Sequence, residues 1–268
     1  MKKHILIIIG IFIVSLGSTQ ELPPNILGIR GGINFSSVTA NKIKPDSYTT
    51  SIRNGLNIGI SYQRLLSKSN KWYIETGLYL TNKGFKQNVH IDEISIDGHG
   101  MPIEIKKYDA YQTGLLYLQV PVLINYHISL NNNITLEPFA GMYASYGISG
   151  RTKLIDIHIF HAEGSAISYK SEIMNSFNKK TFKHIDIGFK LGLGITFYHV
   201  HIGIGYEAGI TKIGGEYYPN IYMANLKYNN GQYKVRNKNW IIQVGYSMPL
   251  YPKQQLKNRF NRIYPLEE

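Results

Sequence analysis

The chain has 268 residues, a formal net charge of +12, 26 glycines, 21 tyrosines and no cysteine. This length suits one domain of moderate size rather than several. The absence of cysteine excludes disulfides, cysteine-based zinc sites and a lipidated N-terminal cysteine. Frequent tyrosine and glycine together with period-two patterning favour an all-β chain over a helical one.

An export signal is expected over residues 1–20. Two lysines precede an apolar run from Ile5 to Leu16, and small residues follow it. The run is shorter than the roughly 20 residues that a spanning helix needs, which argues against the alternative of a retained anchor. We therefore expect cleavage near Gln20 and an exported mature chain.

The basic residues are scattered over the expected loops and the tail rather than gathered in one run. Nucleic acid is not expected as the partner of an exported chain. Two interpretations remain open, which are solvated loops and attraction to anionic lipid head groups or surface polysaccharide.

The stretch 116–126 shows the clearest pattern, because every second residue is large and apolar while the alternate set is partly polar. A period of two indicates a strand whose two faces meet different surroundings. Its length matches the roughly 9–11 residues with which a tilted strand crosses a bilayer. The apolar set is Leu116, Leu118, Val120, Val122, Ile124 and Tyr126.

Similar alternation predicts eight strands, joined by connections that are alternately long and short. Long outer loops and short periplasmic turns are typical of outer-membrane barrels, and they place both termini in the periplasm. We expect an all-β, eight-stranded antiparallel up-and-down transmembrane β-barrel over 21–251, with long extracellular loops and a basic tail over 252–268. The predicted strands are 27–37, 53–64, 72–85, 116–126, 134–148, 182–197, 200–211 and 239–250.

Three of the long connections carry their own expectations. Residues 86–112 are predicted to form a hairpin extension, with two alternating arms around the turn Asp97-Gly98-His99-Gly100. Residues 149–181 are predicted to be a long polar loop, and residues 213–238 a loop that contains Pro219 and Asn229-Asn230-Gly231.

Alternation alone does not say which face points outward, and a soluble lipocalin-like barrel would bury its apolar face. Three features favour apolar residues outside: a glycine-rich opposite face that suits a narrow lumen, ionisable residues there that must pair, and aromatic residues near strand ends. The expected polar lumen network, a structural one, is Arg30, Glu75, Glu137, Asp186, Lys190 and Glu207. The expected interface aromatics are Trp72, Tyr126, Phe197 and Trp240.

Several short motifs, in this order and spacing, resemble the PorT-like outer-membrane beta-barrel protein family of Bacteroidetes. They are Gly28-Ile29-Arg30-Gly31-Gly32-Ile33-Asn34, Tyr117-Leu118-Gln119-Val120-Pro121, Phe139-Ala140-Gly141 and the stretch 185–194. The resemblance covers nearly all of 27–250 and implies a porin-like barrel in the cell outer membrane more than an activity. The family's name-giving protein is linked to protein secretion across the outer membrane. Such barrels usually end on an aromatic residue, for which Tyr251 or Phe260 would have to substitute here.

Candidate catalytic and metal-binding motifs are weak. His127-Ile128-Ser129 matches the H-x-S pattern of lipid A deacylases but falls at the periplasmic end of its strand, far from an outer-leaflet substrate. His199 and His201 lack an obvious third ligand. A second histidine and carboxylate group falls in a predicted loop and comprises Asp156, His158, His161 and Glu163. We expect no catalytic residues, no metal site and no cofactor.

The expected function is therefore non-enzymatic, with binding or a structural role through the extracellular loops or within a membrane complex. A small solute pore is the alternative, and a lipid A-modifying enzyme is a weaker one. The expected surroundings are outer-membrane lipid, lipopolysaccharide included, and protein partners in the outer membrane or periplasm.

Overall fold

The computed structural model describes residues 23–39, 48–67, 71–96, 102–161, 166–177, 181–214 and 235–251. The described part contains a single antiparallel sheet of ten strands. Their bounds are β1 (Asn25–Thr39), β2 (Tyr48–Ser67), β3 (Trp72–Ile96), β4 (Pro102–Tyr126), β5 (Ile128–Ser129), β6 (Ile134–His161), β7 (Ala166–Asn175), β8 (Ile185–Phe197), β9 (Val200–Gly209) and β10 (Arg236–Leu250). Among the described residues, no helix is long and apolar enough to cross a membrane.

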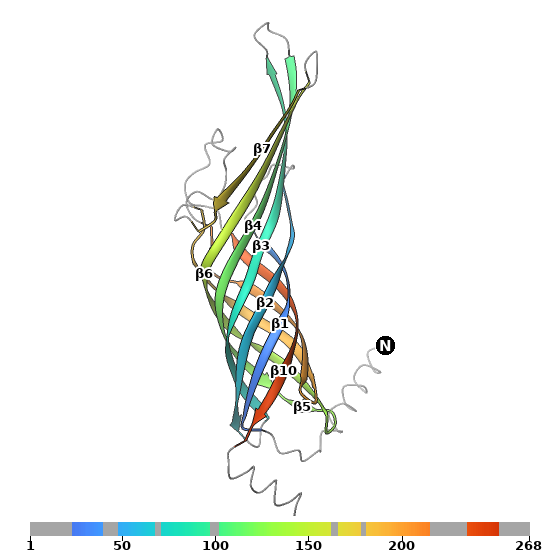
Figure 1. Cartoon of the computed structure of the whole chain (residues 1–268), viewed down its shortest axis with the longest axis vertical. Helices are drawn as coiled ribbons and strands as arrows, with labels where there is room; N and C mark the ends of the chain where they lie inside the picture. Colours follow the sequence, from blue (N-terminus) through green and yellow to red (C-terminus); the bar gives the residue numbers. More distant parts are fainter. Residues whose placement is uncertain are drawn as a thin grey trace, which may run out of the picture.

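The sheet closes on itself, as the strand alternation predicts. The pairings run from β1 through β2, β3, β4, β6, β8, β9 and β10 and return to β1, which leaves no open edge in the ring. The described sheet has two strands more than the sequence analysis expects, β5 and β7, and both pair only with β6. The predicted antiparallel β-barrel is confirmed (Figure 1).

Apolar side chains cover the outside of the ring, which excludes the lipocalin-like alternative with an apolar interior. On β2 the outward residues Leu56, Ile58 and Ile60 are all more than half exposed, whereas the alternate residues Asn57 and Ser61 are each 2% exposed. The other strands of the ring show the same arrangement, with their aliphatic set exposed outside and their mixed, partly polar set buried inside. Such an apolar band suits contact with lipid rather than water.

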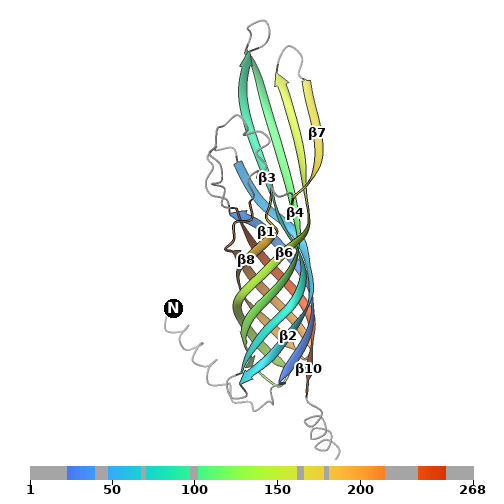
Figure 2. The ribbon, with the colours of Figure 1, turned by 90° about the vertical axis from the view of Figure 1, so that its left-hand side faces the viewer.

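Three strands of the ring, β3, β4 and β6, continue far beyond it. Above the ring β3 pairs with β4, β4 with β6 and β6 with β7, which forms a projecting sheet (Figure 2). The β4–β6 register shifts once on the way, between Leu116 and Tyr117. The predicted hairpin over 86–112 is present as the far ends of β3 and β4, and its turn lies outside the described residues. The backbone alone is described at 48, 89–96, 102–109, 156–161, 166–168 and 170.

The predicted polar loop over 149–181 is wrong. β6 extends to His161, where residues 150–160 pair with β4 on one side and with β7 on the other. The exposed Arg151 and Lys153 interrupt the outward apolar pattern of the strand below, which is why the sequence favours a loop there.

The two ends of the barrel differ. The strands begin and finish at one end, where Asn25 pairs with Leu250 and where short connections join β2 to β3 and β8 to β9; we call this the turn end. The projecting sheet rises from the opposite end, which we call the extension end (Figure 1). The expected signal over 1–20 and tail over 252–268 lie outside the described residues.

Candidate functional site: the filled interior of the barrel

A buried ionic cluster crosses the middle of the barrel. The Nζ atom of Lys83 lies 3.4 Å from Asp186 Oδ2 and 3.0 Å from Glu207 Oε2, and all three side chains are essentially inaccessible to solvent. Lys190 Nζ lies 3.3 Å from the other oxygen of Glu207. Two ammonium groups thus balance two carboxylates, as burial away from water requires. These four residues are called the central ionic cluster below.

Neutral donors occupy the remaining carboxylate lone pairs. Gln119 Nε2 donates to Glu207 at 2.7 Å, and Asn239 Nδ2 donates to it at 3.2 Å. Asp186 accepts from Asn237 Nδ2 at 2.9 Å and from the Tyr143 hydroxyl at 3.3 Å. The donors come from β4, β6 and β10, while the charges come from β3, β8 and β9, so the cluster connects walls that face each other across the lumen.

Lys83 was missing from the predicted lumen network. Its signal was present in the sequence, since Lys83 shares the parity of Tyr73, Glu75 and Tyr79, which the alternation places inside. Its two carboxylate partners are about a hundred residues away along the chain and on strands that are not its neighbours. Periodicity identifies the face of a strand but not what lies across a barrel.

The six predicted network residues are all buried, but they do not form one network. Glu75 accepts hydrogen bonds from Gln63 at 2.8 Å and Asn125 at 2.6 Å, which are neutral partners. Arg30 donates to the Tyr246 carbonyl oxygen at 3.0 Å and to the Ser247 hydroxyl at 2.9 Å.

The expected pairing of Arg30 with an interior carboxylate is therefore wrong for the residues that the structure describes. The reason is local, because the guanidinium turns toward β10, the strand that pairs with its own. Lys190, the other expected partner, does lie against Glu207.

Glu137 belongs to a separate group at the turn end. It accepts a hydrogen bond from the Thr196 hydroxyl at 2.5 Å, and its Oε2 atom lies 3.8 Å from His127 Nε2 and 3.7 Å from His201 Nδ1. The His127 ring stacks on Tyr73 with centroids 4.0 Å apart. A cavity of about 270 Å³ opens beside Glu137 at the turn end.

Glycines make room for the large side chains that fill the lumen. A Cβ atom at Gly188 would lie 2.6 Å from the Tyr143 hydroxyl, and one at Gly59 would lie 2.5 Å from a ring carbon of Tyr79. The glycine-rich inner face therefore allows tyrosine rings from other positions to lie flat against the wall. This leaves little space for water in a narrow ring.

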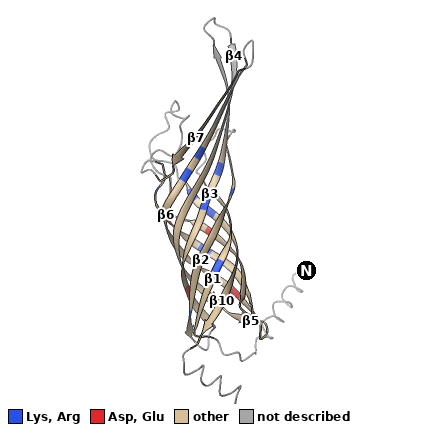
Figure 3. Cartoon of the chain, in the orientation of Figure 1, with Lys and Arg blue, Asp and Glu red and all other residues tan. Residues whose placement is uncertain are grey.

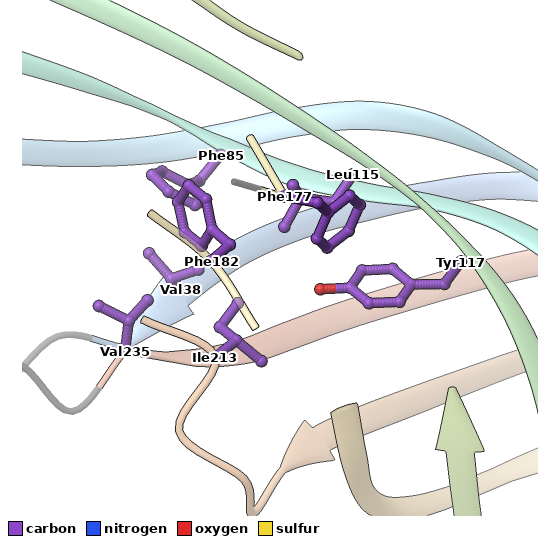
Figure 4. Packing of buried hydrophobic residues seen from close by; sticks show 8 residues of the cluster. All are labelled: Val38, Phe85, Leu115, Tyr117, Phe177, Phe182, Ile213 and Val235. Carbon is purple, nitrogen blue, oxygen red and sulfur yellow. The ribbon is translucent and has the colours of Figure 1, made fainter. Parts of the chain in front are cut away.

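An apolar cluster closes the lumen above the central ionic cluster. Its rings meet edge to face, with Phe85 and Phe182 centroids 6.0 Å apart and Tyr117 and Phe177 centroids 5.7 Å apart. We call it the apolar plug (Figure 4), and its members are Val38, Phe85, Leu115, Tyr117, Phe177, Phe182, Ile213 and Val235.

Connecting segments supply half of the plug. Phe177 follows β7, Phe182 precedes β8, Ile213 follows β9 and Val235 precedes β10. Backbone hydrogen bonds hold these segments together, from the Lys183 amide to the Ile213 carbonyl at 2.8 Å and from the Ile213 amide to the Val235 carbonyl at 2.9 Å. The connections at the extension end thus fold inward over the barrel mouth.

The H-x-S motif lies inside the turn end. His127 and Ser129 are both 4% exposed and border the cavity beside Glu137. His201 contacts Thr196 and Glu137. His199 contacts the Ser247 carbonyl oxygen at 3.0 Å, so the two histidines have different partners.

Metal-ligand clusters of three or more histidine, cysteine or acidic residues are absent from the described part of the chain. The side chains of Asp156, His158 and His161, and all of Glu163, lie outside the described residues.

Aromatic residues gather outside the barrel near both ends. At the turn end Trp72 and Tyr126 are neighbours with centroids 4.7 Å apart, and Phe197 meets Tyr198 edge to face at 4.7 Å. Trp240 lies toward the extension end, 4.8 Å from Tyr206. Two bands of this kind are typical of the places where a barrel meets the two membrane–water interfaces.

A family model described as "Outer membrane protein beta-barrel domain" matches residues 25–215, which is most of the chain. The chain belongs to this family of outer-membrane barrels. The protein therefore resides in the cell outer membrane. Barrels of this class have short turns on the periplasmic side and longer connections outside the cell. No match was found among curated proteins.

Several solved structures are similar over most of their length. The protease OmpT of Escherichia coli has 9% identity and a TM-score of 0.42, with 88% of this chain and 100% of that chain covered. OprG of Pseudomonas aeruginosa has 15% identity and a TM-score of 0.36, with 87% and 100% covered. Ail of Yersinia pestis has 16% identity and a TM-score of 0.34, with 84% and 99% covered.

Proposed function

We propose that this protein is a non-enzymatic outer-membrane barrel with a sealed interior, which supports a binding sheet outside the cell. The observation that carries the proposal is the filling of the lumen by two successive layers. The central ionic cluster joins opposite walls, and the apolar plug covers it on the extracellular side. A solute would have to displace both layers to pass.

The projecting sheet supports the binding role. Strands β3, β4 and β6 are each at least 25 residues long, which far exceeds the roughly 9–11 residues needed to cross a bilayer. The additional length is ordered as a paired sheet rather than as an irregular loop. A rigid surface held away from the membrane suits contact with a partner or with another surface.

The interior carboxylates Glu75, Asp186 and Glu207 support a structural rather than a catalytic role. Asp186 and Glu207 have two or more donors each, and Glu75 has two amide donors. A general acid or base needs access to substrate, whereas these groups are buried among fixed partners.

The finer assignment is that the barrel is a PorT-like one from Bacteroidetes. The short motifs in 28–34, 117–121, 139–141 and 185–194 support it. On this proposal the partners are proteins of the outer membrane or periplasm, and lipopolysaccharide surrounds the outer part of the wall.

Ion conductance tests the sealed interior. The purified full chain, incorporated into planar bilayers, is expected to give no steady conductance steps at voltages where a porin of known conductance does. Steady steps from the wild-type barrel would overturn the proposal and favour the alternative, a small solute pore.

A shortened chain tests the role of the sheet. Val89 pairs with Asp109, and Ile155 pairs with Ser171, so each pair can be joined by a two-residue Asn-Gly turn without change of register. Proteins cross-linked to the full chain on intact cells should be absent with the shortened chain, while both barrels fold. Lipid A mass spectra that change with the full chain would instead favour a lipid-modifying enzyme.

A further inference from the structure

The apolar outer wall gives way to a group of cations on β2, β3 and β6 near the extension end. On β3 the exposed Leu80 is followed by Asn82 and then by the exposed Lys86. On β6 the exposed Ile148 is followed by Arg151 and Lys153, which alternate with buried Thr152. Basic residues thus begin where the membrane-facing band stops, as the upper parts of β3 and β6 show (Figure 3).

A pair of glycines creates a depression in this wall. Gly84 on β3 pairs directly with Gly114 on β4, and Gly114 pairs with Arg151 on β6. Arg53 of β2 reaches across the depression, since a Cβ atom at Gly114 would lie 2.7 Å from its Nη2 atom. Glycine therefore allows an arginine side chain from β2 to lie flat on the wall beside Arg151.

Arg53 is held in place, while its other N–H donors have no partner among the described residues. Its Nη1 atom donates to Asn82 Oδ1 at 2.8 Å. A guanidinium has five N–H donors in a planar fork, which matches the oxygens of a phosphate group.

The depression is a pocket of about 360 Å³, and the charged residues among its described lining are all cations. Its charged residues are Arg53, Arg151 and Lys153, and its other polar side chains come from asparagine, glutamine and serine. Leu116 and Ile173 give it an apolar side. Lys86 lies next to it, because Lys86 pairs with Gln112 and Gln112 pairs with Lys153.

We propose that this pocket binds the phosphorylated head group of a lipid in the outer leaflet, with the acyl chains lying on the apolar band below. Three cations, two of them planar guanidinium groups, suit the oxygens of a phosphate. A carboxylate of a protein partner could also bind such cations, but it would not explain the apolar side of the pocket toward the membrane. The pocket opens on the outer wall at the level where the apolar band ends, which is where lipid head groups lie. The inference goes beyond the proposed function, since it concerns the membrane-facing wall and requires neither a sealed lumen nor the projecting sheet.

Native mass spectrometry of the full chain in neutral detergent tests this site, with a phosphorylated lipid A as the probe. The triple variant Arg53→Gln/Arg151→Gln/Lys153→Gln should weaken lipid binding by at least roughly tenfold, because several charge-assisted hydrogen bonds are lost. A matched control removes three exposed charges at the same end but on the other side of the ring, Lys212→Gln/Arg236→Gln/Lys238→Gln. It should bind as the wild type does, and an equal loss would overturn the site.

Two further arms separate the sources of phosphate. Dephosphorylated lipid A should bind to the wild type at least roughly tenfold more weakly than phosphorylated lipid A does. The triple variant should bind the two lipids equally. Inorganic phosphate at the same concentration should not displace the lipid, because it lacks the apolar part. Equal binding of the dephosphorylated lipid, or displacement by inorganic phosphate, would overturn the assignment to a lipid.

A second variant keeps every charge. Gly114→Val fills the depression where Arg53 lies, and Val suits a strand. It should weaken lipid binding while the barrel keeps its heat-modifiable migration on gels and its lack of conductance. Wild-type affinity in this variant would overturn the site, whereas conductance steps would instead count against the sealed lumen.

Discussion

The two layers that close the lumen work by different physical means. The central ionic cluster depends on charges that must all be present, because a single missing partner leaves another charge buried without compensation. The apolar plug depends on volume, so its stability should fall in proportion to the atoms removed. The first layer is carried by strands of the ring, whereas half of the second comes from connecting segments. The barrel thus has an all-or-none seal in its middle and a graded one at its mouth.

Removing the central charge should have the largest effect. Lys83→Met keeps most of the stem but leaves Asp186 and Glu207 without their shared ammonium, so we expect a loss of about 3–5 kcal/mol in the free energy of unfolding. Urea unfolding in detergent, followed by heat-modifiable migration, measures it.

Lys238→Met is the matched control, because Lys238 is exposed on the wall between buried neighbours. It should change stability by less than roughly 0.5 kcal/mol. Adding Asp186→Asn to Lys83→Met should restore part of the loss; a double variant no more stable than the single one would argue against an uncompensated charge as the cause.

Truncation of the plug should cost somewhat less. Phe182→Ala removes a buried ring from a cluster of eight, and we expect about 3 kcal/mol of destabilisation by the same urea assay. Phe182→Leu should lose only about 1 kcal/mol, since most of the volume remains. If the two substitutions cost the same, the graded behaviour of the plug would be refuted.

Overpacking of the lumen wall should have a smaller effect. Gly188→Ala places a methyl group against the Ala208 carbonyl oxygen and 2.6 Å from the Tyr143 hydroxyl, and we expect it to destabilise the barrel by about 1–3 kcal/mol. Gly31→Ala is the control, because nothing lies within 4 Å of its added Cβ. Thermal unfolding in detergent distinguishes them, and equal midpoints would show that the lumen has room to spare.

Loss of one neutral hydrogen bond should have the smallest effect. Tyr143→Phe removes the donor to Asp186 but leaves the Lys83 and Asn237 contacts, so we expect about 1 kcal/mol. A loss as large as that of Lys83→Met would mean that the hydroxyl, rather than the ammonium, holds the cluster together.

Much of the ring could be predicted because the outer wall meets one uniform surrounding. Apolar residues at every second position identify strands and their outward face, and both predicted sets of Leu and Ile on β2 and β4 lie outside. The strands above the band could not be found in this way. Residues 150–160 and 166–175 form strands above the band, but charged residues such as Arg151, Lys153 and Glu172 interrupt their apolar pattern, which favours a loop in the sequence.

The site shows the same division. Period two places Glu75, Asp186 and Glu207 inside, but only the stagger of the closed ring decides which charges meet across it. The sequence therefore places Lys83 inside but does not predict its carboxylate partners. It also does not show that Arg30 bonds to β10 rather than to an interior carboxylate. The plug was missed because its connecting residues carry no periodicity at all.

The uninterrupted passage of β3, β4 and β6 from the barrel wall into the projecting sheet has a mechanical consequence. A pull on the outer tip would run along the strands, so the ladder hydrogen bonds would share the load in shear rather than open one after another. The load would pass into a closed ring that has no edge at which to peel. A barrel built in this way would resist tension applied to the projecting sheet.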